Sequence, residues 1–105
     1  MQIQVNSDNN VAVDEELARR VEAEVNHTLK RFADRITRVE VHLSDANGGK
    51  FGASDKHCLM EARPAGHEPV AATDQAATLD EAIPGAAQKL QSILSSLFGR
   101  LGARD

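Results

Sequence analysis

Residues 34–45 read DRITRVEVHLSD, and the alternation within this stretch decides the fold. From Thr37 onward, successive side chains of an extended chain point to opposite faces, so apolar and polar residues separate. The apolar side consists of Val39, Val41 and Leu43. The polar side consists of Arg38, Glu40 and His42. The stretch therefore predicts a strand with one face in a core, and it raises the question of what the polar face does.

The length and composition of the chain favour one compact domain over residues 1–105. With 105 residues, 41% of them apolar, it can bury about two thirds of the surface that its unfolded chain exposes. No apolar run is long enough to span a membrane, and the N-terminus does not have the pattern of a signal peptide. A cytoplasmic location is the default expectation. The single cysteine, Cys58, is interpreted as a small buried hydrophobe.

Two amphipathic helices are predicted. The first begins after the capping residue Asp14 and runs to about Asp34. Its buried stripe is Leu17, Val21, Val25, Leu29 and Phe32. The second follows a capping box formed by Thr78 and Glu81. Its stripe is Ile83, Ala86, Ala87, Leu90, Leu94, Leu97 and Leu101. Because Pro84 lacks a backbone donor and crowds the preceding turn, a bend or a restart of this helix is expected there.

Three further strands are predicted at residues 2–6, 57–63 and 70–74, and a Gly-rich loop over 45–55 precedes the second of these. The fold class is therefore α+β: a β-α-β-β-β-α two-layer sandwich with a four-stranded mixed sheet and both helices on one face. The side chains expected to face the helices are Val39, Val41, Leu43, Cys58 and Met60. Those expected to face solvent on the uncovered side are Arg38, Glu40, His42 and Glu61.

The charge is unevenly distributed along the chain. The net charge is −4, which by itself argues against a nucleic-acid partner. However, six basic residues lie between Leu17 and Arg38 against three acidic ones. This surplus is either a cationic binding surface or a solvated helix face with ordinary ion pairs, such as Glu16 with Arg20.

An enzymatic function is not expected. His42 and His57 could stand on adjacent strands near Glu40 and Glu61, which would allow an acid/base pair or a metal site. An open, flat sheet lacks the concave pocket that catalysis needs. No phosphate loop, nucleophile elbow or paired-cysteine spacing is present in the sequence. We therefore predict no catalytic residue, no metal, no cofactor and no small-molecule substrate.

Three stretches in this order of elements carry a family resemblance: MQIQVN at the start, FADRITRVEVHLSD after the first helix, and AIPGAAQKL in the last helix. Together they resemble the ribosome hibernation-promoting factor and ribosome-associated inhibitor family over nearly the whole chain. The resemblance implies a double-stranded-RNA-binding-like domain that lodges in the small ribosomal subunit. There it blocks the mRNA and tRNA path and keeps idle ribosomes inactive under stress or in stationary phase. The chain resembles the short forms, which lack the dimerising extra domain, so a monomer is expected.

Such a role requires basic side chains aimed at ribosomal RNA phosphates. The candidates are Arg19, Arg20, Lys30, Arg31, Arg35, Arg38, Lys89 and Arg100. Among these, Lys89 corresponds most closely to a residue of the family, because KL in AIPGAAQKL matches the family's helix pattern. The chain departs from the family in its last helix, QSILSSLFGRLGARD, which has few basic residues, and at Glu24 and His27. The alternative is a stress-associated interaction domain of the same fold that has lost or altered ribosome binding.

Overall fold

A computed structural model describes residues 1–46 and 56–102, with side chains described up to residue 99. The order of elements is the predicted β-α-β-β-β-α, with a short 3₁₀ helix added after the first α-helix. The elements are β1 (Gln2–Ser7), α1 (Glu15–Thr28), η1 (Lys30–Arg35), β2 (Ile36–Asp45), β3 (Lys56–Pro64), β4 (Val70–Ala76) and α2 (Leu79–Gly102). Most of the loop predicted over 45–55 lies outside the described residues.

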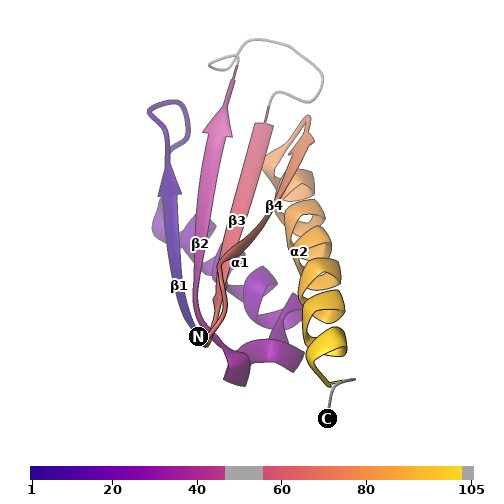
Figure 1. Ribbon diagram of the computed structural model, residues 1–105. Helices are drawn as coiled ribbons and strands as arrows, with labels where there is room; N and C mark the ends of the chain where they lie inside the picture. The colour runs from indigo at the N-terminus through magenta and orange to yellow at the C-terminus, as the bar shows by residue number, and fades with distance from the viewer. Residues whose placement is uncertain (47–55, 103–105) are drawn as a thin grey trace.

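The four strands form one mixed sheet in the order β1-β2-β3-β4. β1 pairs with β2 in parallel, while β3 is antiparallel to both β2 and β4. Both α-helices lie behind the same face of this sheet (Figure 1). The predicted two-layer α+β architecture is thereby confirmed, and no helix of the described part of the chain covers the opposite face of the sheet. Among the described residues, no helix combines the length and apolar character needed to span a bilayer.

The alternation in β2 sorts its side chains between the two faces of the sheet as predicted. Every residue expected to face the helices is at most 1% exposed, namely Val39, Val41, Leu43, Cys58 and Met60. On the uncovered face, His42 is exposed and Arg38 is half-buried. Burial and the nearby negative charge of Asp74 raise the pKa of the Cys58 thiol to about 12, so it remains protonated and unreactive at neutral pH.

The first helix is shorter than predicted. α1 ends at Thr28, with Leu29 as its C-cap, and the chain continues as η1 instead of as α-helix to Asp34. The amide of Phe32 donates to the carbonyl of Leu29 at 2.9 Å, a bond between residues three apart that marks the tighter helix. Residues three apart share a face in either helix type. The apolar spacing could therefore not distinguish an α-helical from a 3₁₀ continuation.

Of the bend or restart expected at Pro84, the restart does not occur. α2 runs without interruption from Leu79 to Gly102, and the amide of Glu81 donates to the Thr78 hydroxyl at its start. Pro84 removes one intrahelical bond, to the carbonyl of Asp80 in the first turn. Burial of an apolar stripe on both sides of the proline offsets that loss. This stripe contains Ile83, Ala86, Ala87, Leu90, Leu94 and Phe98.

Two glycines of α2 provide a matched test of how closely the helix approaches β4. A Cβ added at Gly85 would lie 1.8 Å from Oδ2 of Asp74, whereas one added at Gly99 would meet no atom within 4 Å. We expect Gly99→Ala to raise the free energy of unfolding by about 0.5–1 kcal/mol, the usual difference in helix propensity. Gly85→Ala should instead lower the free energy of unfolding, because the side chain of Asp74 must move to make room for the added methyl group. Urea denaturation of both variants measures the difference, and equal stabilisation would contradict the close approach.

Candidate nucleic-acid interface

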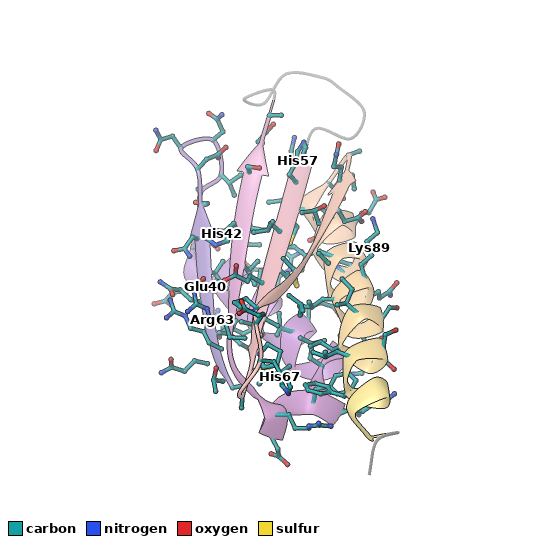
Figure 2. All side chains as sticks on the ribbon, in the orientation of Figure 1. Glu40, His42, His57, Arg63, His67 and Lys89 are labelled. Carbon is teal, nitrogen blue, oxygen red and sulfur yellow. The ribbon has the colours of Figure 1, made fainter. Side chains whose placement is uncertain are left out.

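The cations of the uncovered sheet face are paired with acidic side chains. Arg38 donates to Glu40 and to the side-chain oxygen of Gln4. The Arg63 guanidinium lies 3.7 Å from Glu40 and 3.5 Å from Glu61. Figure 2 shows Glu40 and Arg63 close together on the sheet. Arg38, a predicted RNA contact, is thus held in a network of ion pairs, and the described residues of this face do not form a cationic surface.

The histidines of the same face do not form a metal site with any other described residues. The strand register places Leu59 opposite His42 and Ser44 opposite His57, so the two imidazoles are diagonal neighbours and not a direct pair. Across residues 1–46 and 56–99, no group of three or more His, Cys, Asp or Glu side chains is arranged to hold a metal ion. Within those ranges, the uncovered face offers neither a metal site nor a cationic surface.

Two of the helical candidates also pair with acids. Arg20 forms an ion pair with Asp80, which links α1 to the first turn of α2, instead of the local pair with Glu16. Lys89 places its Nζ 2.8 Å from Oδ1 of Asp74 and 3.3 Å from the carbonyl oxygen of Thr73. Both contacts of Lys89 lie on β4, an edge strand of the sheet. Arg20 and Lys89 thus each connect two elements through an ion pair.

The Lys89 contact makes a prediction about pH. The hydrogen bond from Lys89 is the largest cause that lowers the pKa of Asp74 below its usual value. A carboxyl with a lowered folded-state pKa adds stability above its unfolded pKa of about 3.9, and that stability is lost as the pH falls through the folded pKa. Lys89→Met should raise the Asp74 pKa and destabilise by under about 1 kcal/mol at pH 7, because the ammonium is largely exposed. The part of this difference that comes from the Asp74 charge should disappear as the pH falls below the folded-state pKa of Asp74.

An NMR titration of the Asp74 carboxyl, together with urea denaturation at pH 7 and through the acid range, measures both effects. Lys30→Met is the matched control, since Lys30 has no acidic partner among the described residues. An unchanged Asp74 pKa in Lys89→Met would contradict the assignment.

The basic side chains of η1 differ from Arg20, Arg38 and Lys89, because no acidic side chain of α1 or α2 forms an ion pair with them. Lys30, Arg31 and Arg35 form no ion pair with any described residue; we call them the η1 cluster. The Arg31 guanidinium lies 4.9 Å from the centre of the Phe32 ring, and that of Arg35 lies 3.9 Å from the centre of the Phe98 ring. Stacking on an aromatic face orients a guanidinium while leaving its donors available. The η1 cluster is therefore a partly preorganised cationic surface.

The buried rings beneath the η1 cluster tie it to the end of α2. The centroids of Phe32 and Phe98 are 5.3 Å apart, and both rings are at most 6% exposed. Arg19, on α1, is also exposed and has no acidic partner in the described part of the chain. The side chain of the remaining candidate, Arg100, lies outside the described residues.

A polar groove runs beside the η1 cluster, between α1–η1 and α2. It consists of two adjoining hollows that share Gln91. One is lined by Glu24, His27, Thr28, Lys30, Gln88 and Gln91, and the other by Arg31, Gln91, Ser92, Ser95 and Ser96. We call this the interhelical groove. Its Gln and Ser residues were not predicted from the sequence. In the sequence they appear only as uncharged polar residues on the side of α2 that faces away from the buried stripe.

Comparison with known proteins gives a consistent result. The family described as "Sigma 54 modulation protein / S30EA ribosomal protein" matches residues 3–101. No curated protein sequence gives a significant match. The N-terminal domain of Protein Y from Thermus thermophilus aligns with a TM-score of 0.75 and 20% identity, covering 92% of this chain and 99% of that one. A ribosomal subunit interface protein from Coxiella burnetii aligns with a TM-score of 0.76 and 16% identity, covering 94% and 99%. At such identities these likenesses establish the fold.

Proposed function

The chain belongs to the sigma 54 modulation protein / S30EA ribosomal protein family, and on that premise we propose that it is a ribosome-associated translation inhibitor. It binds the small ribosomal subunit in the path of mRNA and tRNA and keeps idle ribosomes inactive under stress or in stationary phase. Support comes from the family match and from the shared fold with a protein described as a ribosomal subunit interface protein. Such a protein acts in the cytoplasm, where ribosomes are.

The observation that carries the proposal is the η1 cluster. In a chain of net charge −4, its cations have no acidic partner among the described residues, and two of them are oriented by aromatic rings. Cations arranged in this way bind phosphates through charge-assisted hydrogen bonds and by releasing counterions. Occupying a site on ribosomal RNA requires no reaction, so the proposal assigns the chain a binding role without a cofactor.

One observation favours a second candidate function. Arg20, Arg38 and Lys89 are paired with acidic side chains, which reduces the cationic surface available to RNA. A domain of this fold with a weakened ribosomal site could instead bind a protein partner during stress. The two functions differ in whether the chain acts on ribosomes directly.

Cell-free translation separates the two functions. Purified protein added to a translating extract should reduce synthesis in proportion to dose, up to saturation of the ribosomes. A variant with Arg31 and Arg35 both changed to Glu should inhibit far less. Unchanged synthesis at a clear excess of protein over ribosomes would reject the inhibitor function and favour the protein-interaction alternative.

A further inference from the structure

We propose that the interhelical groove holds a single RNA strand and recognises its ribose 2′-hydroxyl groups. This inference rests on the proposed function and names the chemistry by which the same side of the molecule distinguishes RNA from DNA. It is carried by the hydrogen-bonding capacity, the charge and the dimensions of the groove.

The groove is rich in hydrogen-bonding groups that the protein itself does not use. Its neutral side chains on α2 form no hydrogen bond with any other described residue; they are Gln88, Gln91, Ser92, Ser95 and Ser96. Hydroxyl and amide groups both donate and accept. A ribose 2′-hydroxyl also donates and accepts, whereas a phosphate oxygen only accepts. The α2 wall is thus chemically matched to ribose hydroxyls as well as to phosphates.

The opposite wall supplies the charge that a nucleic-acid backbone requires. Lys30 and Arg31 line the groove from η1. The one acid in its lining, Glu24, accepts a hydrogen bond from Thr28 at 2.5 Å. A strand lying along the groove would therefore meet cations on one side and neutral donors and acceptors on the other. This arrangement suits alternating phosphate and ribose groups.

The length of the groove limits how much of a strand it can hold. From Gln88 to Ser96, which both line it, α2 advances by about 12 Å, and this corresponds to a few nucleotides of one strand. The site is therefore suited to a short segment.

The test compares RNA and DNA on matched variants. Fluorescence anisotropy at low salt is measured with a single-stranded oligoribonucleotide that lacks uridine and with DNA of the same sequence. Wild-type protein should bind the RNA about tenfold or more tightly than the DNA, since each neutral hydrogen bond contributes roughly a factor of 2 to 10. The triple variant Ser92→Ala, Ser95→Ala, Ser96→Ala should lose that preference with little change in DNA affinity. Alanine retains helix propensity, so the fold should persist.

Two further variants make the result specific to the groove. Lys30→Gln with Arg31→Gln should weaken RNA and DNA binding by the same factor, because phosphates are common to both. Thr73→Ala with Gln75→Ala, exposed on the uncovered sheet face, should leave both affinities unchanged. Circular dichroism and thermal unfolding confirm that each variant is folded.

Binding of wild-type protein to small ribosomal subunits separates this inference from the proposed function. Equal affinity for RNA and DNA, an RNA preference that survives in the triple serine variant, or no binding of either oligonucleotide would overturn the inference while subunit binding persists. Loss of subunit binding by the wild-type protein itself would instead overturn the proposed function.

Discussion

Changing Arg31 and Arg35 together to glutamate should weaken association with small ribosomal subunits by on the order of 100-fold or more at low salt. Both side chains lie in η1 without an acidic partner among the described residues, so their charge is available to phosphates. The reversal removes two attractive contacts and introduces two repulsive ones. It should also lower the slope of log affinity against log salt by about two. Co-sedimentation across a salt series measures both quantities.

A charge-matched control is available on the uncovered sheet face and the turn after β1. The double reversal takes the net charge from −4 to −8, since each Arg→Glu change removes two units. Four single-unit changes at exposed positions reach the same net charge: Gln2→Glu, Asn9→Asp, Thr73→Glu and Gln75→Glu. This control should lose far less affinity, and so should Glu61→Gln. If the control and the reversal weaken association equally, net charge and not the η1 cluster governs association.

The second large effect concerns stability. Leu90 is fully buried in α2, and Leu90→Ala should lower the free energy of unfolding by about 2–5 kcal/mol through lost burial and the cavity left behind. Total stabilities of small domains are about 5–15 kcal/mol, so the loss is a large fraction. The urea midpoint should fall while the m-value stays unchanged.

The same helix supplies the control for this experiment. Ile93 is 37% exposed, and Ile93→Ala should change stability by less than about 1 kcal/mol. A Leu90→Ala variant as stable as Ile93→Ala would show that α2 does not pack on the sheet as described.

The fold could be predicted from the sequence because its signals are local. The alternation of Val39, Val41 and Leu43 identifies which face of the sheet is covered, and helix caps mark where α1 and α2 begin. The 3₁₀ helix η1 could not be predicted in this way, because its buried Phe32 also satisfies the spacing of an α-helix. Pro84 is a local signal for a restart of the helix, and burial of the apolar stripe of α2 outweighs it.

The candidate site was less predictable, because the partners of its cations depend on tertiary packing. Asp80, which pairs with Arg20, is supplied by the other helix, and Asp74 reaches Lys89 from an edge strand. Only the pairing of Arg38 with Glu40 could have been found from sequence, since residues two apart share a face of a strand. The interhelical groove exists only once the helices are packed side by side.

The measurement that tests the central claim most directly is co-sedimentation of the wild-type protein with purified small ribosomal subunits over about 50–200 mM salt. If Arg19 and the η1 cluster contact phosphates, affinity should fall on the order of 100-fold across that range, from the counterions released at four contacts. Association that is absent at the lowest salt, or present throughout with no dependence on salt, would contradict the account.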